Sequence, residues 1–475
     1  MPSSRLRRLV GRLRRYPGIA WVALGTLVLR GVYGPGYVHY DALYSLIWGR
    51  DLVHGRLPPD FADSHSPTEH PLANVLAGPI SLAHLGGLRT LDWISLVMLA
   101  TLAWMAVRLG RALFTLPIGL GFAALLLTCP PIVEQMLMAS IDVPFLVLIL
   151  WAAVLEAERP RRGLPIVAVL AVCGLLRPEA WLLGAAYVLY LSPRRDWSGR
   201  LRLGGLVLVA PVLWALFDLA SAHDAAISLT GTQRAGHQTQ AQHSLGAAIV
   251  HGPQTLASIL GTGISVLGIA GAGLAFAVRR RRSAVALVLL GLGLLGFLGL
   301  GAVGLPVIPR YAFVPALMVA LFCSYAVFGW AEAPPGSTVR RVWMIGAPLL
   351  LVALVVTNAR YYTHRLPQLR RAATTLSADD GRLDALLATP AVRPLIQGCR
   401  PLQLRDFRAK PLAAYLIGGH ARDYVQLLPQ QVAGPGSYLE HIPVRGEPAL
   451  PPGFRTVWGV RHWTLSSTCP SAPSG

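Results

Sequence analysis

Two short motifs, HYDALY at residues 39–44 and PTEHP at residues 67–71, bound the stretch around which this chain is organised. The stretch follows the first apolar segment directly and is dense in Asp, His, Tyr and Pro, whereas the surrounding sequence is mostly apolar. Ionisable side chains held against a bilayer often mark a functional site. We therefore expect chemistry here, although a solvated connector between two membrane segments would have a similar composition.

The composition is that of a multi-pass membrane protein, which we assign to the cell (plasma or inner) membrane. Hydrophobic residues make up 54% of the 475 residues and charged residues only 13%. Repeated apolar runs of about 20 residues match a hydrocarbon core of about 30 Å. The formal net charge is +20, but the arginines form short clusters between apolar runs. That pattern sets membrane topology, and we expect no nucleic-acid partner.

The arginine clusters predict how the chain crosses the membrane. The basic residues of segment 1–16 place the N-terminus in the cytoplasm. If the ambiguous piece 72–87 lies in the interface, as a re-entrant or horizontal helix, every later cluster also falls inside. This arrangement gives about eleven spans and an extracytoplasmic C-terminus. The predicted spans are 18–33, 91–108, 116–134, 142–157, 164–176, 180–192, 203–221, 254–277, 283–304, 311–330 and 342–358.

Two domains are predicted from the change in composition near residue 358. Residues 1–358 would form a transmembrane domain that includes a first extracytoplasmic loop at 34–90. Residues 359–475 contain no run of spanning length and read as a small extracytoplasmic α/β domain. The elements expected in this second domain are a helix at 366–390, strands at 401–404 and 424–428, and a helix at 410–418.

Two cysteines, Cys399 and Cys469, fall in the polar C-terminal region, whereas the other three lie in apolar runs and read as packing residues. An extracytoplasmic domain is exposed to oxidising conditions. We therefore predict a Cys399–Cys469 disulfide that ties the end of the chain to the outer domain.

Charged residues interrupt the apolar sequence at two further points. Arg177 and Glu179 lie between the short runs 164–176 and 180–192, so they would sit at or below the outer interface. Charges there mark a cavity wall unless they form a structural ion pair with each other. Arg310 lies between two spans, where it could hold an anionic substrate group or reach the lipid headgroups as a membrane anchor.

The polar loop 222–252 contains four histidines, and three of them, His223, His237 and His243, are candidate metal ligands. Their spacing does not match that of metal ligands. We therefore predict a flexible loop that faces substrate and assign no metal ligands. The sequence indicates no cofactor and leaves a divalent metal ion open.

The order of these motifs resembles the GT-C superfamily of polyprenyl-phosphate-sugar-dependent glycosyltransferases. The superfamily includes protein mannosyltransferases and the aminoarabinose and mycobacterial cell-wall transferases. Its members have an Asp-Glu pair just after the first span, matched here by Asp41, and a His-Pro-Pro-type motif, matched by Glu69-His70-Pro71. The motifs SIDVP at 140–144, LLRPE at 175–179 and Arg310-Tyr311 also have family counterparts.

The similarity extends over most of the membrane region and departs from the family pattern at two positions. Ala42 stands where the family has Glu, and Leu72 stands where it has the second Pro. These departures leave the sugar and the acceptor open.

The resemblance implies transfer of a sugar, with inversion, from a polyprenyl-phosphate-linked donor to an acceptor hydroxyl on the outer face of the membrane. The acceptor could be a glycan, a lipid or a protein. By this resemblance Asp41 is the base that takes the hydroxyl proton, and Arg177 and Arg310 bind the donor phosphate. A phosphate leaving group is already a stable anion, so it needs a cation rather than a general acid. The remaining matched positions would contact substrate: Tyr40, Glu69, His70, Asp142, Glu179 and Tyr311.

A helix is predicted to begin at Asp41, with the Asp41 carboxylate as its N-cap. Its apolar residues would face the membrane, as in an interfacial helix: Leu43, Leu46, Ile47 and Trp48.

Two other function classes fit part of the pattern. A multi-pass transporter or flippase of lipid-linked saccharides would also have interrupted helices and charges inside the membrane. It has less need of the long polar first loop and of a soluble appendage, and we see no inverted repeat. A non-catalytic assembly or receptor component is the third alternative.

Overall fold

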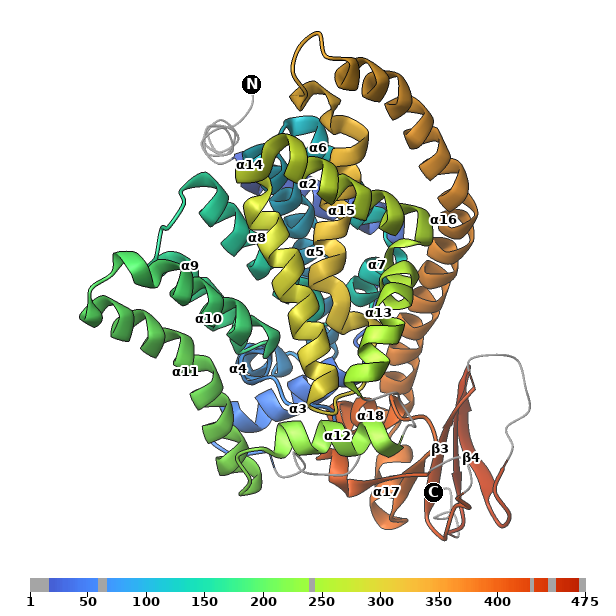
Figure 1. Cartoon of the computed structure of the whole chain (residues 1–475). Coiled ribbons are helices and arrows are strands. Elements are labelled where there is room, and N and C mark those ends of the chain that lie inside the picture. The colour runs from blue at the N-terminus through green and yellow to red at the C-terminus, as the bar shows by residue number, and fades with distance from the viewer. Residues whose placement is uncertain (1–16, 59–65, 239–243, 428–430, 443–449, 470–475) are drawn as a thin grey trace, which may run out of the picture.

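The chain folds as an α-helical, multi-pass membrane protein with a small sheet near its C-terminus (Figure 1). The computed structural model describes residues 17–58, 66–238, 244–427, 431–442 and 450–469. The α-helices are α2 (Pro17–Tyr33), α3 (Tyr40–Val53), α4 (Pro71–Ser81), α5 (Leu85–Leu113), α6 (Leu116–Thr128), α7 (Pro130–Leu137), α8 (Asp142–Glu158), α9 (Leu164–Gly174), α10 (Glu179–Leu191), α11 (Trp197–Ala222), α12 (Ile227–Gln238), α13 (Leu245–Leu260), α14 (Thr262–Ala302), α15 (Phe313–Phe328), α16 (Thr338–Leu387), α17 (Val392–Gly398) and α18 (Ala409–Ile417). The strands are β1 (Leu402–Leu404), β2 (Tyr424–Gln426), β3 (Ser437–His441), β4 (Arg455–Val460) and β5 (Trp463–Ser467).

The number of helices able to cross a membrane is smaller than predicted. Within the described residues, five helices are long and apolar enough, or six if the bent pair α6 and α7 is one span. The five are Leu85–Leu113, Trp197–Ala222, Thr262–Ala302, Pro309–Glu332 and Thr338–Ala359. The predicted count of eleven is therefore not confirmed. Several apolar runs form helices as short as α9, which has 11 residues and rises about 16 Å, half the thickness of the hydrocarbon core.

The predicted spans 254–277 and 283–304 are divided differently in the structure. Helix α13 ends at Leu260, and Gly261 follows with a φ of 86°, a backbone conformation that glycine adopts without strain. Helix α14 then continues to Ala302 through a bend at Arg279, whose φ and ψ of −139° and 47° are not helical. Gly261 therefore interrupts the first predicted span, whereas the kink at Arg279 falls where the sequence predicts the boundary between the two spans.

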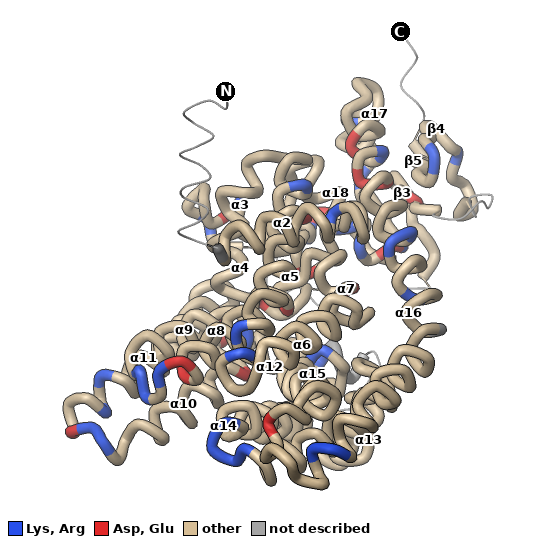
Figure 2. Tube along the Cα trace, turned by 90° about the horizontal axis from the view of Figure 1, so that it is seen from above, with Lys and Arg blue, Asp and Glu red and all other residues tan. Residues whose placement is uncertain are grey.

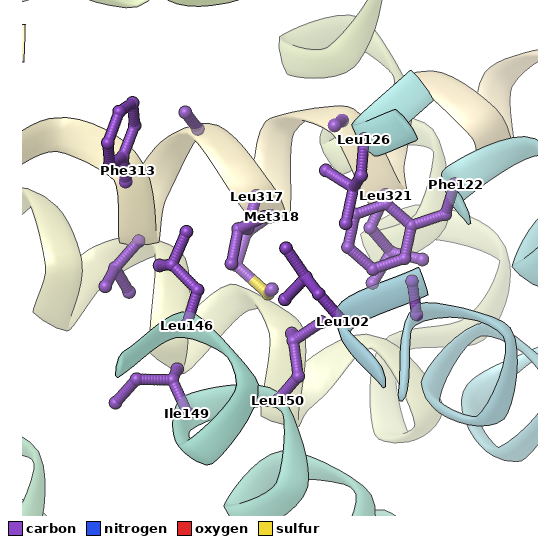
Figure 3. Close-up of a cluster of buried hydrophobic side chains, with 14 of the residues drawn as sticks. Leu102, Phe122, Leu126, Leu146, Ile149, Leu150, Phe313, Leu317, Met318 and Leu321 are labelled. Atoms are coloured by element: carbon purple, nitrogen blue, oxygen red, sulfur yellow. The ribbon is translucent and has the colours of Figure 1, made fainter. Parts of the chain in front are cut away.

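Helix α15 lies at the centre of the bundle, and nearly all of its residues are buried. Figure 3 shows Leu317, Met318 and Leu321 of α15 packed among apolar side chains of α5, α6 and α8. Helix α14 approaches α15 so closely that a Cβ atom at Gly268 or Gly271 would collide with the α15 backbone, and glycine at these two positions permits the contact. Such close contact matters in lipid, where the hydrophobic effect does little to hold helices together.

Helices α3 and α4 lie across the end of the bundle that faces the C-terminal sheet (Figure 1). Helix α4 has 11 residues, too few to cross a membrane, as expected for the segment 72–87. The predicted membrane-facing side of α3 is wrong. The four apolar residues of that side are at most 1% exposed and pack in a cluster with α18, so the apolar face of α3 meets protein rather than lipid. These four residues are Leu43, Leu46, Ile47 and Trp48.

The C-terminal region is a five-stranded sheet in the order β2-β1-β3-β5-β4. The two predicted strands and the helix between them are present as β1, β2 and α18, and the two strands run parallel. The predicted helix at 366–390 is the end of α16, a helix of 50 residues that continues through the expected domain boundary at 358. One rigid element therefore links the membrane bundle to the sheet (Figure 1). The predicted disulfide between Cys399 and Cys469 is present.

Basic segments lie far from the C-terminal sheet. Figures 1 and 2 place the bend of α14, which carries Arg279–Arg282, and the turn between α10 and α11 away from β3 and β4. At the bend, Arg279 Nε donates to Glu332 Oε2 at 2.6 Å.

Candidate active site

Asp41 occupies the first turn of α3 but does not cap it. His39 is the N-cap residue, with extended backbone angles and no side-chain capping bond, so the prediction that Asp41 is the cap is wrong. The segment before α3 is fixed instead by backbone bonds to the end of α7. Tyr37 N donates to Leu137 O at 2.7 Å, and His39 N donates to Met138 O at 3.0 Å. The Asp41 carboxylate is therefore not engaged in capping and turns towards a different partner.

That partner is Arg310, which lies in the 3-10 turn η2 (Pro309–Ala312) between α14 and α15. Arg310 Nη1 donates to Asp41 Oδ2 at 3.1 Å, and the two side chains are 34% and 32% exposed. Burial alone would raise the pKa of the Asp41 carboxyl, but the charge and hydrogen bond of Arg310, together with the nearby His39 and His70, outweigh burial and that pKa lies below its usual value. Asp41 is therefore ionised at neutral pH and can accept a proton.

Two cavities meet at Arg310. The larger has a volume of about 320 Å³ and a mainly apolar wall that includes Trp181 and Trp214. The smaller has a volume of about 250 Å³ and a more polar wall. Three residues line both: His70, Ile141 and Arg310. Of the other predicted site residues, the larger cavity brings together Asp142, Arg177, Glu179 and Tyr311, and the smaller one Tyr40 and Asp41.

Arg177 reaches the larger cavity from the turn between α9 and α10, but carboxylates already surround it. It is only 4% exposed and forms ion pairs with Asp142 and, at 2.7 Å, with Glu179. Its guanidinium carbon lies 5.1 Å from the centre of the Tyr311 ring, and that of Arg310 lies 5.7 Å from the same ring. Both arginines therefore flank Tyr311, and the structural ion pair considered from the sequence is present, with Asp142 as an additional member.

His70 and Glu69, which are neighbours in sequence, have different surroundings. His70 is the N-cap residue of α4, and its ring meets the Trp214 ring edge-on at 5.8 Å. Burial lowers the pKa of His70 to about 3, so its ring is neutral. Glu69 is fully buried, accepts a hydrogen bond from Asn74 Nδ2 at 2.7 Å, and lines neither cavity. Burial and the nearby Asp218 charge raise the pKa of Glu69 well above its usual value.

The region predicted as a flexible loop, 222–252, is largely helical. Helix α12 lies within it and contributes Ser228, Leu229 and Thr232 to the wall of the larger cavity. The structure does not describe the side chains of two histidines noted there, His237 and His243. In the described part of the chain, no three His, Cys, Asp or Glu side chains are grouped as a metal site.

Several residues of the two cavities were not found from the sequence. In the sequence, Trp181 and Trp214 cannot be told apart from aromatic residues that merely face lipid. Gln135 lies in α7, the shorter helix of the bent pair α6 and α7. Phe407 comes from the C-terminal sheet region and lines the smaller cavity beside Tyr40. The only sequence signal for Phe407 was a large aromatic residue between charged neighbours in a polar segment.

Comparisons with known proteins bear on the fold. No protein-family model and no curated protein matches the sequence. The structure is similar to that of ArnT from Cupriavidus metallidurans bound to undecaprenyl phosphate, with a TM-score of 0.53 and 13% identity over 95% of this chain and 98% of that one. It is also similar to the apo Archaeoglobus fulgidus oligosaccharyltransferase, with a TM-score of 0.51 and 11% identity over 88% of this chain and 65% of the other. The chain therefore shares the fold of these two membrane proteins.

Proposed function

We propose that the protein is a membrane glycosyltransferase that moves a sugar from a polyprenyl-phosphate donor to an acceptor hydroxyl, with inversion at the anomeric carbon. The observation that carries the proposal is the Asp41–Arg310 pair at the meeting point of two cavities. A base that lines the smaller cavity, in contact with a cation that lines both, suits a reaction in which the smaller cavity supplies the attacking group and the larger one receives the leaving group.

The larger cavity would hold the donor. Its apolar wall suits the first isoprene units, and Arg310 offers the planar guanidinium that binds phosphate oxygens. Arg177 would assist, but its charge is already matched by Asp142 and Glu179. Arg310 is paired with one carboxylate, so it is the stronger phosphate ligand of the two in this proposal. Glu179 and Tyr311, in the same wall, would contact the sugar or hold the arginines in place.

The smaller cavity would hold the acceptor. Its hydroxyl gives its proton to the Asp41 carboxylate as the oxygen attacks the anomeric carbon. The bond from that carbon to the phosphate oxygen breaks, and its electron pair leaves with the polyprenyl phosphate, whose added charge Arg310 stabilises. Because this is a single displacement, with attack on the face opposite the departing phosphate, the configuration at the anomeric carbon inverts.

Donor binding would also change Asp41. A donor phosphate competes with Asp41 for Arg310, since both anions approach the same guanidinium. Loss of that partner would let the pKa of Asp41 rise towards its usual value. Asp41 would then be a stronger base when the donor is bound than when it is absent.

We further propose that the site lies on the extracytoplasmic face. The basic segments at the α14 bend and the α10–α11 turn, far from the sheet in Figures 1 and 2, support a cytoplasmic position for that end. On this proposal residues 1–358 carry the base and the phosphate ligands, and residues 359–475 form an outer domain beside the acceptor cavity.

The direct test uses a polyprenyl phosphate linked to a radiolabelled sugar and the purified full chain in detergent. Transfer of label to a hydroxyl acceptor, with one polyprenyl phosphate released per sugar transferred, is the expected result. In proteoliposomes, movement of intact donor across the bilayer without release of polyprenyl phosphate would identify a flippase instead. Binding of donor with neither release nor movement would exclude both activities.

A further inference from the structure

An aromatic side chain from the C-terminal domain reaches the smaller cavity. Phe407 lies between β1 and α18 and is 49% exposed, although it contacts two rings of the membrane domain. Its ring centre lies 5.3 Å from that of Tyr40 and 6.1 Å from that of His39, and both contacts are edge-to-face. The ring is thus held at the cavity wall while much of its surface stays open.

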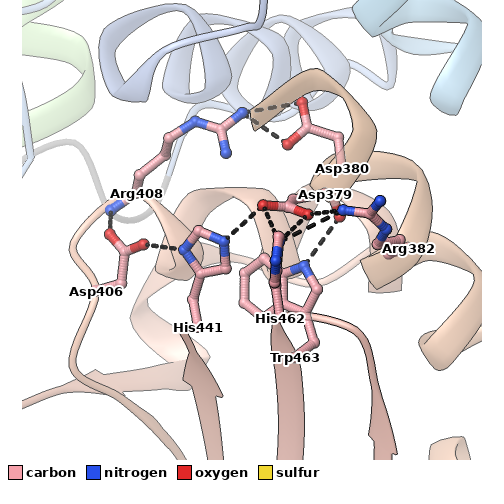
Figure 4. A network of polar contacts seen from close by, with 8 residues as sticks. All are labelled: Asp379, Asp380, Arg382, Asp406, Arg408, His441, His462 and Trp463. Atoms are coloured by element: carbon pink, nitrogen blue, oxygen red, sulfur yellow. Dashed lines mark hydrogen bonds and ion pairs between the residues drawn. The ribbon is translucent and has the colours of Figure 1, made fainter. Parts of the chain in front are cut away.

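The residues on either side of Phe407 fix its position. Arg408 Nη2 donates to Val38 O at 2.9 Å and pairs with Asp380 at 2.8 Å, and both charged side chains are buried. The ion pair joins the segment to α16 (Figure 4), and the bond to Val38 joins it to the backbone just before α3. A buried charge pair of this kind is strongly destabilised if one partner is lost, so the segment cannot move without breaking it.

Asp406 is held from the other side. Its carboxylate accepts from His441 Nδ1 at 3.1 Å, and His441 Nε2 donates to Asp379 at 3.1 Å (Figure 4). Burial alone would lower the pKa of the His441 ring, but the hydrogen bonds to the two carboxylates outweigh burial and raise that pKa. The charged imidazole therefore ties the Phe407 segment to α16 through a second route.

The remainder of the cavity wall is mixed, with polar side chains set among Ala42, Met138 and Ile141. Asp41, Ser45, Gln135 and Ser140 line it together with the Phe407 ring. One open aromatic face among several hydrogen-bonding groups suits a ligand with one apolar and several polar faces. A sugar ring has this character: its C–H groups pack on the negative face of an aromatic ring, and its hydroxyls bond to the polar wall. A lipid chain would need a continuous apolar wall.

We propose that Phe407 is the platform for a sugar ring of the acceptor, so that the protein extends a glycan rather than modifying a lipid alcohol or a peptide. This inference rests on the proposed function for the identity of the reaction. It adds the chemical class of the acceptor and assigns a specificity-determining residue to the C-terminal domain.

The experiment measures binding of saccharides separately from turnover. Saturation-transfer NMR would compare methyl glycosides and short oligosaccharides with a long-chain alcohol and a serine-containing peptide, each with the full chain in detergent. The variants are Phe407→Ala, Phe407→Leu, which keeps an apolar side chain without a ring, and Phe407→Trp. Trp458→Ala is the matched control, because Trp458 is 41% exposed on β4 and lines neither cavity.

We expect one class of saccharide to bind the wild type, with affinity about tenfold weaker in Phe407→Ala and Phe407→Leu and near normal in Phe407→Trp. With a labelled donor, the KM for that saccharide should rise by a similar factor while donor affinity is unchanged. Saccharide binding that survives Phe407→Ala, or that is lost equally in Trp458→Ala, would overturn the proposal. So would binding of only the alcohol or the peptide. Ring-dependent saccharide binding without any donor turnover would support the subsite and refute the proposed reaction.

Discussion

Replacement of Asp41 by Asn removes a base and a charge while keeping the size of the side chain. The change does not remove a helix cap, because His39 is the N-cap residue of α3. Both side chains of the Asp41–Arg310 pair are about one third exposed, so losing the ion pair should cost at most about 1 kcal/mol of stability. The variant should therefore fold with a nearly unchanged Tm, and a loss of turnover can be attributed to chemistry.

Turnover of Asp41→Asn should fall by about 100-fold or more, because an amide does not accept the hydroxyl proton. That loss corresponds to about 2.7 kcal/mol of transition-state stabilisation. Donor affinity should move the other way. With no carboxylate competing for Arg310, the donor phosphate should bind up to about fivefold more tightly, the equivalent of the ion pair that is lost.

The assay combines single-turnover transfer of labelled sugar with equilibrium binding of the polyprenyl phosphate to purified protein. Near-normal turnover in Asp41→Asn would refute the role of Asp41 as the base, and Asp142, which lines the larger cavity, would become the next candidate. Donor affinity that falls in parallel with turnover would show instead that Asp41 helps to hold the phosphate site together.

The pH dependence of the wild type tests the same pair. Asp41 acts as a base only when ionised, and its pKa in the free enzyme lies below the usual value. The acidic limb of kcat/KM for the donor, which reports the free enzyme, should therefore lie below the usual range of an aspartate. The acidic limb measured with saturating donor should lie at higher pH, because the phosphate draws Arg310 away. Coincident limbs would contradict this competition.

Three further predictions concern the arginines, the disulfide and the topology. Arg177→Gln should lower stability by about 3–5 kcal/mol, since it leaves the Asp142 and Glu179 carboxylates without their cation. Arg310→Gln should mainly weaken donor binding, and Arg310→Lys should restore that binding in part. Thermal unfolding with polyprenyl-phosphate titration separates the two effects, and equal Tm values for Arg177→Gln and Arg310→Gln would contradict the assignment. Thiol labelling of the denatured, non-reduced chain should find Cys399 and Cys469 blocked, and two reactive thiols would exclude the bond. A reporter that is active only in the cytoplasm should be silent when fused within residues 359–475, and a signal there would reverse the proposed orientation.

The sequence was most informative where polar residues stand out against apolar surroundings. Asp41, Arg177 and Arg310 were identified because a charged side chain between membrane segments needs a partner or a cavity, and all three line the paired cavities. The βαβ arrangement of β1, α18 and β2 was likewise recognised from short apolar runs in a polar region.

Other features depend on contacts that a linear pattern does not contain. The apolar face of α3 was read as lipid-facing because Leu43 and Trp48 look the same whether lipid or protein covers them, and here α18 covers them. Counting basic clusters constrains which side a segment lies on but not how long each helix is, so the sequence predicts the interruption near Arg279 but not the break at Gly261. Phe407 joins the site only through the folding of the C-terminal domain against α3.

The most direct measurement of the central claim is an experimental structure of the full chain with a bound polyprenyl phosphate. We predict phosphate density in the larger cavity within hydrogen-bonding distance of the Arg310 guanidinium, the prenyl chain along Trp181 and Trp214, and Asp41 on the far side of Arg310, facing the smaller cavity. A phosphate bound away from Arg310, or one that fills the smaller cavity beside Phe407, would contradict the assignment of donor and acceptor sides.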